Sequence, residues 1–188
     1  MWQTDVTYLK VIDWGWFYLS TILDDYSRYV VGWKLCGTIR AEDVTDTLDI
    51  ALAASGFESA KVVHKPRLLS DNGSSYIAED LAKYLEDKGM KHVRGARMHP
   101  QTQGKIERWH LTLKNRILLE NYSLEDELEA AIAAFIDHYN NHRYHESIGN
   151  LTPADVYFGH GETILAERKR IKQQTIQNHR LNHQCQAA

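Results

Sequence analysis

Alternation of apolar and polar positions predicts three strands in the first forty residues. Residues 5–12, 16–23 and 29–36 are rich in β-branched and aromatic side chains, the composition of half-buried strands. Two short polar segments, at 13–15 and 24–28, separate them and have the residues of tight turns. Three strands joined by such short turns predict an antiparallel meander.

The apolar spacing then changes to the period of a helix. Residues 41–55 and 76–88 are the first two predicted helices, and Gly89 ends the second. Short apolar segments at 67–70 and 91–94 flank the second helix and predict two more strands. The positions expected to face inward are Val44, Leu48, Ala51 and Leu52 on the first helix, and Ile77, Leu81, Tyr84 and Leu85 on the second.

The second half of the chain is predicted to be helical. A helix at 104–119 carries a core stripe of Ile106, Trp109, Leu113 and Ile117. A capping box from Ser123 to Asp126 opens a helix that runs to about Asn141. Thr152 followed by Pro153 repeats the start signal, and from Glu162 onward the chain is polar with helical propensity.

This order of elements predicts an α/β domain with a mixed five-stranded sheet flanked by helices, the arrangement of a ribonuclease H-like fold. We expect a catalytic core over residues 1–160 and a polar C-terminal helical extension over 161–188. A composition of 43% hydrophobic and 25% charged residues fits a globular domain. No apolar run could span a bilayer, so we expect a cytoplasmic protein that does not act in a membrane.

The net charge of −3 is unevenly distributed. Residues 91–116 carry seven lysines and arginines against one acid, and residues 165–188 carry five against one. Charge alone would still favour a solvated helix face over a DNA-binding surface. Two cysteines, Cys36 and Cys185, form no C-x-x-C, so neither a disulfide framework nor a cysteine zinc site is indicated.

Three acids change this picture. Asp5 lies near the start of a predicted strand, Asp71 follows another, and Glu107 lies in the first turns of a helix. Taken singly, each has an ordinary explanation, as a surface residue, a turn residue and a helix-dipole partner. Three carboxylates from separate elements can also hold divalent metal and drive phosphoryl transfer.

The local sequence around each acid resembles the three signature segments of the retroviral integrase superfamily, and in particular the bacterial insertion-sequence transposases. The resemblance covers about residues 2–159 and includes further segments at 23–28, 139–145 and 151–155. The signature segments are Trp2-Gln3-Thr4-Asp5, Ser70-Asp71-Asn72-Gly73-Ser74 and His99-Pro100-Gln101-Thr102-Gln103-Gly104-Lys105-Ile106-Glu107-Arg108.

The resemblance implies a D-D-E transposase or integrase core that cleaves DNA and transfers strands. Asp5, Asp71 and Glu107 would be catalytic and would hold two Mg²⁺ or Mn²⁺ ions. The implied partners are DNA, both element ends and target, and further copies of the chain in a homodimer or higher oligomer on DNA, associated with the nucleoid. The side chains expected to contact DNA are His99, Gln103, Lys105, Arg108, His110 and Lys114.

Two rival functions use the same residues. The first is a structure-specific ribonuclease H-like nuclease. The second is a truncated or domesticated non-catalytic fragment that binds DNA. Members of the family usually carry a helix-turn-helix region before the core, whereas this sequence begins at Met1, four residues before Asp5. Recognition of element ends is therefore expected to be weak.

Three smaller features have ordinary explanations. Asp24 and Asp25 fit a hairpin turn better than a metal pair. The spacing of His138, His142 and His145 suits a metal, but an aromatic and polar helix face is favoured. The five tryptophans are expected mostly in the core.

Overall fold

The computed structural model describes residues 1–11, 14–57, 65–95 and 103–186. Three antiparallel strands open the chain, β1 (Trp2–Val11), β2 (Gly15–Asp24) and β3 (Val30–Cys36). Two parallel strands of three residues each, β4 (Leu68–Ser70) and β5 (His92–Arg94), complete a sheet of order β3-β2-β1-β4-β5. The predicted mixed five-stranded sheet is therefore confirmed.

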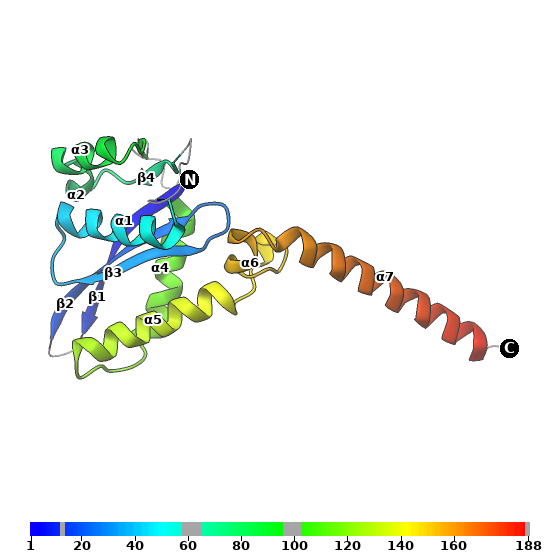
Figure 1. Cartoon of the computed structure of the whole chain (residues 1–188). Coiled ribbons are helices and arrows are strands. Elements are labelled where there is room, and N and C mark those ends of the chain that lie inside the picture. The colour runs from blue at the N-terminus through cyan, green and yellow to red at the C-terminus, as the bar shows by residue number, and fades with distance from the viewer. Residues whose placement is uncertain (12–13, 58–64, 96–102, 187–188) are drawn as a thin grey trace.

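Helices cover both faces of this sheet (Figure 1). On one face lie α1 (Ala41–Ser55), the single turn α2 (Ser74–Ile77) and α3 (Glu79–Asp87). On the other lie α4 (Gly104–Ile117) and α5 (Glu125–Asn141). The chain ends with η2 (Glu146–Ile148), α6 (Pro153–Tyr157) and the long helix α7 (Gly161–Gln186), which points away from the sheet.

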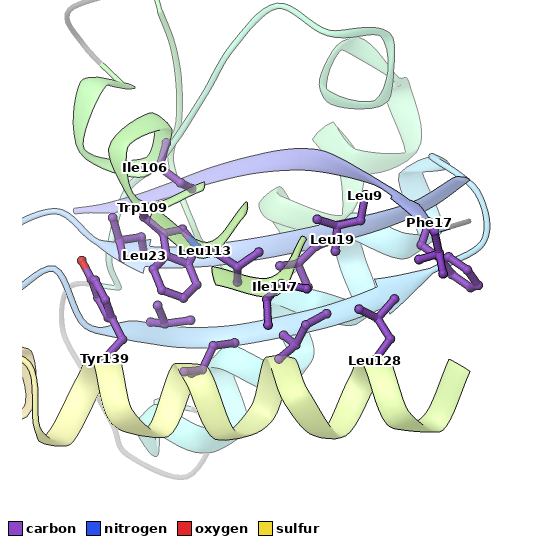
Figure 2. Packing of buried hydrophobic residues seen from close by; sticks show 14 residues of the cluster. Leu9, Phe17, Leu19, Leu23, Ile106, Trp109, Leu113, Ile117, Leu128 and Tyr139 are labelled. Atoms are coloured by element: carbon purple, nitrogen blue, oxygen red, sulfur yellow. The ribbon is translucent and has the colours of Figure 1, made fainter. Parts of the chain in front are cut away.

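The apolar stripes explain these positions. All four predicted stripe residues of α4 are buried, and they lie between the sheet and α5 (Figure 2). The predicted stripe of α1 is fully buried on the opposite face. A polar tie also joins α5 to the sheet, because the buried side chain of Asn140 donates to the Val30 carbonyl at 3.0 Å and accepts from its amide at 2.9 Å.

Two local predictions were wrong. The helix expected at 76–88 is broken at Ala78, whose ψ of 137° is extended, and Ile77 is consequently 51% exposed. The capping carboxylate of α5 belongs to Glu127, which accepts from the Ser123 and Leu124 amides, and not to Asp126.

The tryptophans are mostly in the core, as predicted. Trp2 and Trp109 are buried and Trp33 packs against the core, whereas Trp14 and Trp16 are 50% and 51% exposed. Both lie at the turn end of the β1–β2 hairpin. No helix in the described part of the chain is long and apolar enough to cross a membrane.

Candidate active site

Asp5 lies on β1, on the sheet face that α4 covers. One carboxylate oxygen accepts from the neighbouring Val6 amide at 2.9 Å. The other lies 3.3 Å from Nδ1 of His110, a buried side chain on α4. About a quarter of the Asp5 side chain remains exposed (23%), so the carboxylate is held in place yet open to a ligand.

Asp71 follows β4 directly and is exposed. The parallel register pairs Gln3 with Leu69, and Asp5 and Asp71 each lie two residues beyond that pair. The Asp71 carboxylate accepts from the Gly73 amide at 2.8 Å, and a Cβ on Gly73 would lie only 3.0 Å from that oxygen. Gly73 thus leaves room for the carboxylate above the turn.

Tyr76 lies within electrostatic range of these two acids, which was not expected from the sequence. Its hydroxyl is buried and lies 3.4 Å from Oγ1 of Thr4. Burial raises the pKa of Tyr76, and the negative charges of Asp5 and Asp71 raise it further. The hydroxyl therefore stays neutral, and its partner is Thr4, the residue before Asp5 on β1. An aromatic residue at the start of a helix gives no signal of this role in the sequence.

Glu107 lies in the first turn of α4 and is exposed. Within the described residues, no set of three histidine, cysteine, aspartate or glutamate side chains is placed to hold a metal ion, so the three acids do not form a closed metal site in this arrangement. The chemistry of the three acids nonetheless fits a hard dication, which prefers carboxylate oxygens. Asp5, on β1, and Asp71, directly after β4, come from neighbouring elements of the sheet.

A buried set of hydrogen bonds holds the start of α4 against β1. Gln3 is 1% exposed; its side-chain oxygen accepts from the Ile106 amide at 3.1 Å and its nitrogen donates to Asp25 at 2.8 Å. Lys105 donates to the Asp25 carbonyl at 2.6 Å and to its carboxylate at 3.0 Å. We call Gln3, Asp25, Lys105 and the Ile106 amide the Gln3 lock. It fixes the element that carries Glu107 relative to the strand that carries Asp5.

The side chains predicted to contact DNA have different surroundings. Lys105 belongs to the Gln3 lock, and Gln103 is buried and donates to the Thr4 carbonyl at 3.4 Å. Arg108 is exposed beside Glu107. His99 lies outside the described residues. His110 is buried against Asp5, as described above, and Lys114 is half-buried with Nζ 4.0 Å from the Tyr8 ring centre.

The other candidate metal groups have ordinary contacts. Asp24 accepts from the backbone and hydroxyl of Ser27 at 2.9 and 2.7 Å, as a turn residue does. The His138 and His142 rings lie 6.0 Å apart, and His145 packs edge-on against Tyr139.

Two models of the integrase core domain match this chain, one over residues 1–100 and the other over residues 88–153. The transposase of insertion sequence element IS629 from Shigella sonnei is 27% identical over 156 residues, which are 82% of this chain and 50% of the relative. The transposase of insertion sequence IS3A from Escherichia coli is 27% identical over 154 residues, 81% of this chain and 51% of the relative. The chain therefore spans about half the length of these relatives.

Solved structures share the fold. The magnesium complex of the HTLV-2 integrase catalytic core domain superposes with a TM-score of 0.65 at 20% identity, over 83% of this chain and 94% of the other. This likeness confirms the predicted ribonuclease H-like fold.

Proposed function

This chain belongs to the integrase core-domain family, as its matches to that domain and to insertion-sequence transposases show, and from this we propose that it is the catalytic core of a DNA transposase. Its reactions would be metal-dependent phosphodiester cleavage and strand transfer, with water or a DNA 3′-hydroxyl as the attacking group. The observation that supports the proposal is the parallel pairing of β1 with β4, because Asp5 and Asp71 each lie two residues beyond the paired residues Gln3 and Leu69.

Asp5, Asp71 and Glu107 are the residues that would hold divalent metal, as two Mg²⁺ or Mn²⁺ ions. When bound, such ions supply Lewis-acid stabilisation of the reacting phosphate and activate the attacking hydroxyl. The chain itself orients the ligands. His110 holds one oxygen of Asp5, the Gly73 amide holds one of Asp71, and the Gln3 lock sets the start of the helix that bears Glu107.

DNA would lie across the open side of this site. Arg108 is exposed next to Glu107, and Lys114 lies two turns further along α4, so both can contact phosphates and position the strand without reading bases. Gln103, Lys105 and His110 act on the DNA indirectly, since each is engaged with β1 or with Asp25. The partners we infer are element ends, target DNA and further copies of this chain.

Plasmid nicking tests the proposal. Asp5→Asn, Asp71→Asn and Glu107→Gln should each abolish nicking in Mg²⁺ or Mn²⁺ without loss of folding, because each removes a metal ligand and leaves the shape of the side chain. Glu129→Gln, an exposed acid on α5, is the matched control and should cut like the wild type. A variant of the three that keeps wild-type nicking would remove that residue from the catalytic set.

Strand transfer separates this reaction from the rival nuclease. A labelled DNA with a recessed 3′-hydroxyl should become joined to a target plasmid by the wild type. Cleavage without any joined product would favour the nuclease, and binding without cleavage would favour the non-catalytic fragment.

A further inference from the structure

Exposed aromatic rings gather on the β1–β2 hairpin, next to the candidate active site. Tyr8 is 57% exposed and Trp16 51%, and their ring centres lie 5.4 Å apart with the planes at 71°. Lys10 and Trp16 are direct cross-strand partners, so both rings belong to one patch of the sheet. Large rings in such a patch are unusual on a surface without a binding role.

The patch arises because the hairpin extends past its covering helix. Side chains alternate between sheet faces, so Tyr8 and Lys10 share a face with Val6. Val6 packs with the α1 side of the core, whereas the next two positions on that face are exposed. Within the described residues β4 pairs with β1 only at Trp2 and Gln3, so the edge of β1 beside the patch is open as well.

Two lysines accompany the rings. Lys114 Nζ lies 4.0 Å from the Tyr8 ring centre and Lys10 Nζ lies 5.7 Å from that of Trp16. Neither lysine has a carboxylate partner in the described part of the chain, so both charges are available to a ligand. Burial lowers the pKa of Lys114, and the negative charge of Asp5 opposes this shift.

We propose that Tyr8, Trp16, Lys10 and Lys114 bind unpaired DNA beside the cleavage site, with the rings stacking on bases and the lysines contacting phosphates. Rings that carry adjacent cations are the combination that binds single strands, because every base has a face to stack once it leaves the duplex. A paired duplex hides those faces. A second copy of the chain is disfavoured as the occupant, since a two-fold contact would bring the lysines of both copies together. The inference rests on the proposed function for its substrate, DNA.

Binding measured without metal tests this surface. Fluorescence anisotropy would follow a labelled single strand and a duplex of equal length, in EDTA, with the whole chain. Tyr8→Ala and Trp16→Ala should weaken single-strand binding roughly 5-fold to 100-fold and leave duplex binding almost unchanged. Tyr8→Phe keeps the ring and should bind like the wild type. Lys10→Ala should weaken the binding of both the single strand and the duplex, and should reduce the salt dependence of binding.

The matched control is Tyr26→Ala. The Tyr26 ring is 79% exposed at the β2–β3 turn, and its removal should leave the binding of both DNA forms unchanged. Thermal unfolding of each variant shows that its fold is intact. Wild-type affinity for the single strand in both alanine variants would overturn the inference, and so would an equal loss on duplex or a changed oligomeric state with unchanged DNA binding. Metal-dependent nicking by the wild type, assayed in parallel, distinguishes failure of this surface from failure of the proposed activity.

Discussion

Gln3 shows how a single buried amide can organise residues far apart in the sequence. Its two polar atoms satisfy the Ile106 amide and the Asp25 carboxylate, 103 and 22 residues away. Ile106 and Glu107 are adjacent on α4, so the position of a proposed metal ligand depends on this amide. The signature segments therefore include residues that support the acids as well as the acids themselves.

Gln3→Ala should destabilise the chain and impair cleavage together. Truncation leaves the Ile106 amide buried without its partner, which costs about 1–3 kcal/mol in the free energy of unfolding. Urea unfolding measures the loss. Arg116→Ala removes an exposed ion pair with Glu120 and should cost less than about 1 kcal/mol. If both variants lost the same free energy of unfolding, the Gln3 side chain would contribute no more to stability than an exposed ion pair.

His145 should make stability depend on pH. Burial, together with the charges of Arg143 and Arg28, lowers the pKa of His145 from 6.5 to about 4. Between these values the unfolded chain binds a proton that the folded chain does not. This stabilisation is therefore complete above about pH 6.5 and is lost as the pH falls towards about 4.

His145→Phe keeps a ring against Tyr139 and cannot titrate. The free energy of unfolding of this variant should fall less than that of the wild type between pH 7 and pH 4.5, as measured by urea unfolding at each pH. His179→Phe, at an exposed position on α7, should follow the wild type. If the free energy of unfolding fell equally with pH in the wild type and in His145→Phe, His145 would not be the source of this pH dependence.

At the scale of elements, Gly32 sets how closely α1 approaches β3. A Cβ at this position would lie 2.9 Å from the Ala51 Cβ and 3.0 Å from its Cα. Gly32→Ala should therefore lower the free energy of unfolding by about 1–3 kcal/mol through overpacking. Adding Ala51→Gly should restore part of the loss. Gly104→Ala, at the first residue of α4 where a Cβ meets nothing within 4 Å, should be neutral or slightly stabilising in thermal unfolding.

Most elements could be predicted because their apolar periods are long. The α1 range was predicted to the residue, and the α4 stripe was confirmed. The break at Ala78 was missed because local spacing continues through it, and the short strands β4 and β5 are bounded by tertiary pairing. The acids were recognisable from their neighbours in the sequence. Tyr76 and the Gln3 lock were not, because their partners come from distant segments.

On the scale of the whole molecule, α7 is joined to the core only through its first turns. Arg168 donates to the Asn150 carbonyl at 2.8 Å, and Leu165 lies against Gly149. Beyond Arg170, no hydrogen bond or ion pair joins the described part of the helix to the rest of the chain. Helices without tertiary packing are marginal in water.

A chain ending at Arg170 should therefore unfold within about 2 °C of the full chain, since the part removed contributes little to the core. Hydrogen exchange on the full chain should be much faster over 171–186 than over α5. Strong protection of that segment in the isolated chain, or a large fall in melting temperature on truncation, would show that α7 is held by contacts beyond its first turns.

Asp5 and Asp71 belong to parts of the sheet that differ in their resistance to local unfolding. Asp5 lies within the ten-residue strands of the meander, whereas Asp71 follows a strand of three residues that meets β1 at two positions. Short pairings with few hydrogen bonds can open at lower free energy than the global transition. On warming, β4 should therefore separate from β1, and Asp71 from Asp5, while most of the molecule is still native. The divalent metal proposed for this site would oppose this opening by mass action if it bridged Asp5 and Asp71, so binding of metal should stabilise β4 more than the rest of the sheet.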